Sequence, residues 1–175
     1  FKTGSHIEKF CQQAQTAAQQ VGEMFSDKIK AEVISQKDLF NFNYHEIADT
    51  SPQKYHSSFD RITDKYLPAI QEPILQNNPD IIYAGAVDIN GYFPTHNLCF
   101  SKPLTGNITT DTINNRTKRI FDDSTGSRCG QHTSRFLLQT YKRDTGEVMH
   151  DVSAPIYVDG KHWGGFRIGF TAQLG

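Results

Sequence analysis

The sequence lacks an excess of charge of either sign, which excludes one broad class of function. Its 175 residues include 18 Lys or Arg and 19 Asp or Glu, for a formal net charge of −1. A nucleic-acid-binding protein shows a basic stripe or a basic isoelectric point, whereas the isoelectric point here is about 6.7. We therefore expect no nucleic-acid partner.

Long apolar runs are also lacking. No stretch approaches the roughly 20 apolar residues that cross a bilayer, and no signal-peptide pattern is visible. The chain begins at Phe1 rather than at a methionine. We expect a single domain, residues 1–175, taken from a longer membrane protein whose spans lie outside this chain; that length can bury a core of its own.

Cysteine is scarce. Cys11, Cys99 and Cys129 are too few, and odd in number, for a disulfide framework. One disulfide, between Cys99 and Cys129, is possible in an oxidising compartment. Isolated buried thiols are the interpretation that we favour, because free cysteine is among the most often buried residue types.

Three strand-length runs near the C-terminus give the strongest structural signal. Residues in each run alternate between two faces, as in a pleated sheet. Asp144-Thr145-Gly146 separates the first two runs, and the hairpin dipeptide Asp159-Gly160 separates the last two. The sequence therefore predicts three consecutive antiparallel strands that need a covering layer on one face. The runs are Phe136–Lys142, Val148–Val158 and His162–Phe170.

A long amphipathic helix is predicted over residues 1–34. Apolar or small side chains recur there at helical spacing, and the other face is rich in Gln and Lys. The helix either simply covers the sheet or also forms a dimer and continues into a membrane span, which would explain its length. The stripe consists of Ile7, Phe10, Ala14, Ala17, Val21 and Met24.

Residues 35–79 are predicted to be a helical segment. Ser35 caps a short helical turn, Phe42–Thr50 is a loop, and Ser51-Pro52 opens a second helix. Proline interrupts the following stretch, so Leu67–Gln76 is expected to be a short or kinked helix. The stripe of the second helix would be Tyr55, Phe59, Ile62 and Tyr66.

Residues 80–170 are predicted to hold the sheet. Asp80–Val87 reads as a buried strand and Tyr92–His96 as its hairpin partner, while Ser101–Asn115 is polar and loop-like. Arg116–Asp123 is predicted to be helical and to be broken by Ser124-Thr125-Gly126. The fold class is therefore α+β, with a five-stranded antiparallel sheet.

These elements, in this order, resemble the Cache/PAS-like extracytoplasmic sensor domain of bacterial methyl-accepting chemotaxis receptors. The resemblance is carried by VDINGYFPTHN at Val87–Asn97, NRTKRIFDD at Asn115–Asp123, and the block Phe136–Phe170. It implies a periplasmic domain of an inner-membrane protein that binds a small-molecule ligand, forms a homodimer and transmits a signal through its first helix. Both membrane spans would lie outside this chain.

Some relatives of such domains carry covalent haem through Cys-x-x-Cys-His. Here Arg128 and Gln131 occupy the two cysteine positions before His132. A c-type haem is therefore not expected, and we predict no cofactor. The alternative is a redox or gas sensor that binds haem non-covalently through His132 or another histidine.

Arg116 and Arg119 are the first candidates for ligand binding. They lie three apart on the expected helix and would share a face. Guanidinium groups match the geometry of a carboxylate, although ion pairs with Asp122 and Asp123 are the plainer explanation. The resemblance implies that this segment lines a ligand pocket, with Phe121 as its apolar wall.

Gln139 and Tyr141 share one face of their predicted strand. Two adjacent polar-tipped side chains suit a pocket, or that face is simply solvated. The resemblance implies that the tyrosine at position 141 faces the ligand.

Asp151 is unusual in the middle of a strand. It would either bind a ligand amine or pair with a neighbour such as Arg167. Amino-acid-binding relatives often carry an acidic residue late in the final strand, where Gly169 stands here. The resemblance therefore favours a small carboxylate or another polar metabolite over an α-amino acid.

Metal binding and catalysis have weaker support. Cys129 and His132 lie three apart, but no second pair at zinc-like spacing follows, so we predict no metal site. A Cys129 nucleophile with His132 or His150 as base would lack any recognised catalytic motif. We expect a sensor rather than an enzyme; a purely structural domain that holds receptor dimers together is the other alternative.

Overall fold

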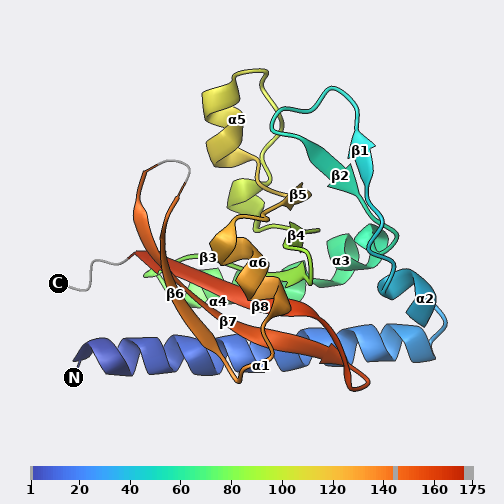
Figure 1. Cartoon of the computed structure of the whole chain (residues 1–175), viewed down its shortest axis with the longest axis horizontal. Coiled ribbons are helices and arrows are strands. Elements are labelled where there is room, and N and C mark those ends of the chain that lie inside the picture. Colours follow the sequence, from blue (N-terminus) through green and yellow to red (C-terminus); the bar gives the residue numbers. More distant parts are fainter. Residues whose placement is uncertain (1, 144–145, 172–175) are drawn as a thin grey trace.

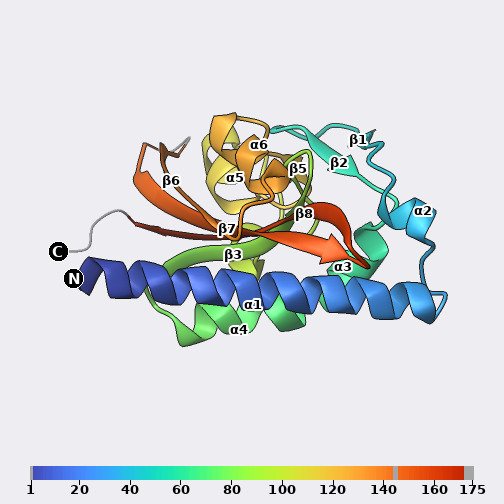
Figure 2. The ribbon, with the colours of Figure 1, turned by 60° about the horizontal axis from the view of Figure 1, so that its bottom comes forward.

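The computed structural model describes residues 2–143 and 146–171, with side chains from residue 7 onward. Helix α1 (Lys2–Lys30) runs along one face of the sheet (Figures 1 and 2). Its predicted apolar stripe is the buried face, with Phe10, Ala14 and Val21 each at most 2% exposed. The helix ends at Lys30, four residues before the predicted end at residue 34, and Glu32 just beyond it has a positive φ of 59°.

The main sheet is antiparallel and has four strands in the order β3-β8-β7-β6. With α1 across it, the chain is α+β, as predicted. Helix α4 lies beside α1, while α5 and α6 lie on the other face of the sheet (Figure 2). The strands are β3 (Ile81–Asp88), β6 (Leu137–Lys142), β7 (Val148–Val158) and β8 (Lys161–Thr171).

The three C-terminal strands match the prediction closely. Asp159 and Gly160 both have positive φ, 50° and 82°, which is the geometry of a two-residue hairpin turn. Val158 pairs with Lys161 across this turn. Of the predicted turn 144–146, residues 144 and 145 lie outside the described part of the chain.

The five-stranded sheet was not correct, because the expected second strand leaves the sheet. Strand β4 (Tyr92–Phe93) pairs instead with β5 (Arg119–Ile120). Side-chain amides occupy the place beside β3. Asn97 accepts from the Ala84 N–H at 2.9 Å and donates to the Ala84 carbonyl at 2.9 Å, and Gln71 accepts from the Ala86 N–H at 3.0 Å. The outer edge of β3 is thus closed without a strand.

The helix predicted from Ser51-Pro52 starts later. Helix α3 (Asp60–Tyr66) is preceded by a small hairpin of β1 (His45–Ile47) and β2 (Lys54–His56), where a loop and a helix had been expected. Tyr55 belongs to β2, and its N–H donates to the Lys118 carbonyl at 2.8 Å. This long-range bond uses the Tyr55 backbone N–H, which in a helix would have bonded to a carbonyl of the helix itself.

The segment 116–123 is not a helix either. Arg119 and Ile120 form β5, and Lys118 has a positive φ of 62°. The stretch expected to break the helix instead opens α6 (Ser124–Gln131). Close packing explains this: the Cβ of an alanine at Gly165 would lie 2.1 Å from the Cys129 carbonyl oxygen, so glycine in β8 lets α6 sit directly on the sheet.

The other elements are short. The predicted turn after Ser35 is α2 (Gln36–Leu39), whose Asp38 N–H donates to the Ser35 hydroxyl at 3.0 Å. The expected short helix is α4 (Pro68–Asn77). The polar stretch after Ser101, predicted to be a loop, contains α5 (Ile108–Asn114) and follows a 3₁₀ turn at Leu98–Phe100.

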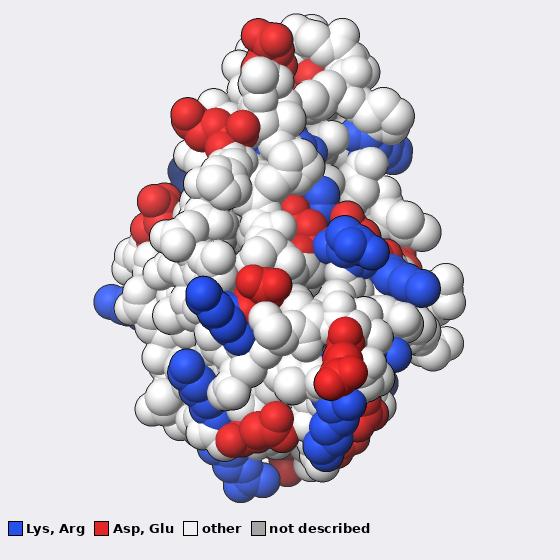
Figure 3. Space-filling model, turned by 90° about the vertical axis from the view of Figure 1, so that its right-hand side faces the viewer, with Lys and Arg blue, Asp and Glu red and all other residues white. Residues whose placement is uncertain are grey.

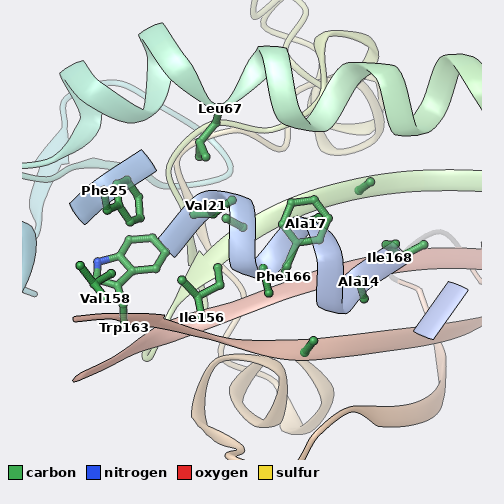
Figure 4. Close-up of a cluster of buried hydrophobic side chains, with 14 of the residues drawn as sticks. Ala14, Ala17, Val21, Phe25, Leu67, Ile156, Val158, Trp163, Phe166 and Ile168 are labelled. Atoms are coloured by element: carbon green, nitrogen blue, oxygen red, sulfur yellow. The ribbon is translucent and has the colours of Figure 1, made fainter. Parts of the chain in front are cut away.

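The hydrophobic core lies between α1 and the sheet (Figure 4). Trp163 is fully buried, packs edge-on against Phe25 at 4.8 Å and donates its indole N–H to the Leu39 carbonyl at 3.0 Å. Phe166 and Ile168 of β8 face the same way. Alternation along β8 therefore turns Arg167 toward the opposite face of the sheet.

The distribution of charge on the surface and the apolarity of the described helices agree with what the sequence predicts. At the end of the molecule seen in Figure 3, cationic and anionic side chains are interspersed. Within the described residues, no helix combines the length and apolarity needed to cross a membrane.

Gly22 provides a test of how tightly α1 is seated. A Cβ there would lie 2.3 Å from the Tyr157 carbonyl oxygen. Gly22→Ala should therefore destabilise the fold by about 1–3 kcal/mol, although alanine would favour an isolated helix by about 1 kcal/mol. Urea unfolding measures the difference, and Gln20→Ala, at an exposed position of the same helix, should change stability little. A Gly22→Ala protein as stable as the wild type would show that α1 lies further from β7.

Candidate functional site

A cavity of about 400 Å³ lies on the face of the sheet opposite α1. Its floor comes from the sheet, and its cover comes from β4, β5 and the segments that follow each of them. Five lining side chains are at most 6% exposed and form the deep part: Tyr83, Phe93, His96, Arg116 and Arg167. Half-buried walls are Arg119, Ile120, Phe121, Tyr141 and Arg143, and the exposed mouth carries Asp122, Asp123 and Lys142.

A buried carboxylate organises the floor. Asp151 has no solvent exposure and accepts from Arg167 Nε at 2.8 Å, from the Tyr83 hydroxyl at 2.5 Å and from Cys129 Sγ at 3.1 Å. Burial opposes the charge on Arg167, but the Asp151 carboxylate outweighs it and holds the pKa of Arg167 well above its usual value. The sequence alternative of an Asp151–Arg167 ion pair is therefore correct.

The structure brings five of the seven predicted site residues to the cavity lining: Arg116, Arg119, Phe121, Tyr141 and Arg167. The other two lie beneath the floor. Asp151 is sealed by Arg167 and Tyr83, and Gln139 donates to the Thr125 carbonyl at 3.1 Å and to Cys129 Sγ at 3.5 Å. Gln139 therefore fastens β6 to α6 instead of facing the cavity.

Arg116 and Arg119 meet at the cavity for a different reason from the one predicted. They do not share a helical face, because Arg119 lies in β5. Arg116 Nε donates to the Ile113 carbonyl at 3.1 Å. The Arg119 guanidinium lies 4.8 Å from the centre of the Phe121 ring, as a cation–π contact requires, so Phe121 is a wall that also orients Arg119.

His96 was missed as a site residue and assigned only to the hairpin loop. Its ring stacks on Phe93 with centroids 3.9 Å apart, and Nδ1 accepts from the Asn97 N–H at 2.8 Å. Burial, followed by the nearby Arg116 and Arg167, lowers the pKa of His96 well below its usual value. The ring is therefore neutral, with its proton on Nε2. Only the position of residues 92–97 relative to β3 could have revealed that His96 lines the cavity.

The lining is positively charged on balance. It contains five cationic side chains and two carboxylates, and both carboxylates stand at the exposed mouth. Arg143 is matched by the exposed Glu147 at 3.1 Å, and Arg167 by Asp151. Cationic side chains thus outnumber carboxylates in a lining that is partly shielded from water, so the cavity favours an anion.

Cys129 is a buried packing residue in this arrangement. Burial raises the pKa of its thiol, and the thiol donates to Asp151; a nucleophile needs the opposite shift, toward thiolate. All three cysteines are free, so the bridge between Cys99 and Cys129 is not formed.

His132, which the haem alternative named as an iron ligand together with the possibility of another histidine, lies outside the cavity lining. Its Nε2 hydrogen-bonds to the Ser153 hydroxyl at 2.9 Å. Among the side chains described, those of residues 7–143 and 146–171, no three His, Cys, Asp or Glu converge as a metal site requires.

The Asp151 carboxylate should be the most sensitive polar position in the fold. Asp151→Asn leaves the buried Arg167 without its countercharge and should cost about 3–5 kcal/mol of unfolding free energy. Urea unfolding at neutral pH measures this. Asp80→Asn, at an exposed position, is the matched control and should cost less than about 0.5 kcal/mol. A loss below about 1 kcal/mol for Asp151→Asn would mean that water reaches Arg167 and solvates its charge in place of the carboxylate.

No family model, curated protein or solved structure matches this chain.

Proposed function

We propose that this chain is the ligand-binding sensor domain of a bacterial chemotaxis receptor, of the Cache/PAS-like type, and that it acts in the periplasm as part of an inner-membrane protein. The observation that carries the proposal is the cationic cavity on the face of the sheet opposite α1. In this proposal the domain binds its ligand and catalyses nothing.

The strand arrangement is compatible with a five-stranded Cache/PAS-like ancestor. In this interpretation β4 corresponds to the missing edge strand, displaced from β3 by the Asn97 and Gln71 side chains. The displaced segment continues through His96, which borders the cavity. The segment that leaves the sheet, instead of forming its fifth strand, thus supplies part of the cavity cover.

The ligand that best fits this cavity is a small carboxylate. Guanidinium groups bind carboxylates in a forked geometry, and the apolar wall formed by Ile120 and Phe121 favours a short carbon skeleton. A cavity of about 400 Å³ lies at the lower end of the range for small-molecule sites.

Transmission would pass through the sheet. The floor residue Arg167 and its partner Asp151 lie on β8 and β7, and α1 packs on the opposite face of these strands. A ligand that favours one position of the cover over another would shift the sheet against α1. Such coupling cannot exceed the difference in the ligand's affinity for the two arrangements.

A homodimer along α1 remains part of the proposal, but on a different surface from the one first expected. The apolar stripe is used inside the domain, so a partner helix would meet the polar face that carries Gln12, Thr16 and Glu23. Sedimentation velocity from micromolar to millimolar protein should show a weak, concentration-dependent dimer. Gln12→Glu together with Thr16→Glu should weaken it by like-charge repulsion. A single monomeric species over the whole range, or a dimer unaffected by both substitutions, would contradict pairing through this face.

Ligand binding is tested by thermal unfolding against a panel of small carboxylates, amines and amino acids. A compound at a hundred times its Kd should stabilise the domain by about 2.7 kcal/mol. In a domain of this size the unfolding midpoint rises by roughly 2–4 °C for each kcal/mol of stabilisation. We expect carboxylates to raise the midpoint, and Arg119→Ala to remove that shift because it removes a cationic wall.

The matched control is Arg61→Ala, which removes an exposed arginine away from the cavity and should leave the shift intact. Circular dichroism confirms that each variant is folded. If no compound stabilises the wild type, the domain is better described as a structural spacer within a receptor dimer.

A further inference from the structure

The direction of the hydrogen bonds in the cavity floor can be worked out from the donors available. Tyr83 has one hydroxyl proton, and Asp151 is a carboxylate held by Arg167. A carboxylate only accepts, so the 2.5 Å bond between Tyr83 and Asp151 takes the Tyr83 proton. The Tyr83 oxygen can therefore only accept from its other neighbours.

Those neighbours are Tyr141 and Arg167. The hydroxyls of Tyr83 and Tyr141 lie 2.8 Å apart, and because the Tyr83 proton is already used, Tyr141 must be the donor. Arg167 Nη2 donates to the same oxygen at 3.2 Å. Burial raises the pKa of both tyrosines, so both keep their protons at neutral pH. The Tyr141 oxygen is left with lone pairs and no proton to offer a ligand.

The other polar side chains in the deep part and the walls have the opposite character. Arginines carry only donors, and neutral His96 offers its Nε2–H because Nδ1 already accepts. The carboxylates of Asp122 and Asp123 stand at the exposed mouth. Tyr141 is therefore the acceptor among the inner side chains that line the cavity.

We propose that the ligand is a small hydroxycarboxylate, whose carboxylate is bound by the arginines and whose hydroxyl donates to the Tyr141 oxygen. This deepens the proposed function and rests on it. A plain carboxylate would leave the Tyr141 oxygen desolvated and unpaired, which costs binding energy. An ammonium would supply a donor but would enter a region of net positive charge.

Gly169 strengthens this choice. A Cβ at Gly169 would lie 2.1 Å from the Tyr83 ring, so that ring covers the position where an acidic side chain could have received an amine. The same glycine lets Tyr83 reach Asp151. The Tyr83–Tyr141 pair thus presents a neutral acceptor at this part of the cavity.

The test uses ligands matched in skeleton and differing in one group. Calorimetry gives Kd for propionate and lactate, butyrate and 3-hydroxybutyrate, and succinate and malate, with alanine as the amino counterpart of lactate and both enantiomers where they exist. In at least one pair we expect the hydroxy acid to bind about tenfold more tightly, the size of one hydrogen bond. Alanine should bind more weakly than lactate.

Tyr141→Phe keeps the ring and removes the accepting oxygen. It should abolish the preference for the hydroxy acid, so that the two members of each pair bind within about twofold of each other. Tyr157→Phe, at an exposed tyrosine outside the cavity lining, should change neither affinity.

The outcomes separate the two proposals. If carboxylates bind but no pair shows a hydroxyl preference, or if the preference survives Tyr141→Phe, the hydroxycarboxylate inference is wrong and the sensor proposal stands. Tighter binding of alanine than of lactate overturns it in the same way. If neither member of any pair binds to the wild type, the sensor proposal fails, and this inference fails with it.

Discussion

The ion pair between Asp151 and Arg167 is the interaction on which the site depends. Burying either charge alone would be costly, so the pair is stable only because every neighbour contributes. Tyr83 and Cys129 complete the hydrogen bonding of the carboxylate, and these two residues come from β3 and α6. One carboxylate therefore joins three strands and a helix, and the floor of the cavity is fixed by the same contacts that stabilise the sheet.

The cover of the cavity can form because β3 is the edge strand of its sheet. Asn97 and Gln71 satisfy the backbone groups of its outer edge, so the chain after Asp88 is free to cross the sheet instead of extending it. Gly91 makes the crossing possible with a φ of 81°, and its carbonyl accepts from the Phe121 N–H at 2.8 Å. Loss of regular pairing at one edge thus lets the segment that includes His96 form part of the cavity cover.

Local patterns predicted the parts of the fold that local physics decides. The strand of Val148–Val158, the Asp159-Gly160 turn and the apolar face of α1 all depend on neighbours in the sequence, and all were foreseen. The errors fall where distant partners decide. Tyr55 pairs with Lys118, the Asn97 side chain replaces a strand, and α6 forms over glycines that only matter against the sheet. Five of seven cavity candidates were found because residue chemistry pointed to them, while His96 and Tyr83 required knowledge of which face each turn presents.

In the proposed sensor, the division between floor and cover also restricts which ligands can signal. The floor is held by buried charge, whereas the cover is tied to β3 by the Asn97 side chain and is held together by the short β4–β5 pairing. A ligand bound only to the floor would meet the same contacts in every position of the cover and would shift no equilibrium, however tightly it bound. A signalling ligand must therefore touch Arg119 in the cover and Tyr141 or Arg167 in the sheet at once. A carboxylate with a separate hydroxyl has the two ends that this geometry demands, so binding specificity and signal transmission would depend on the same pair of contacts.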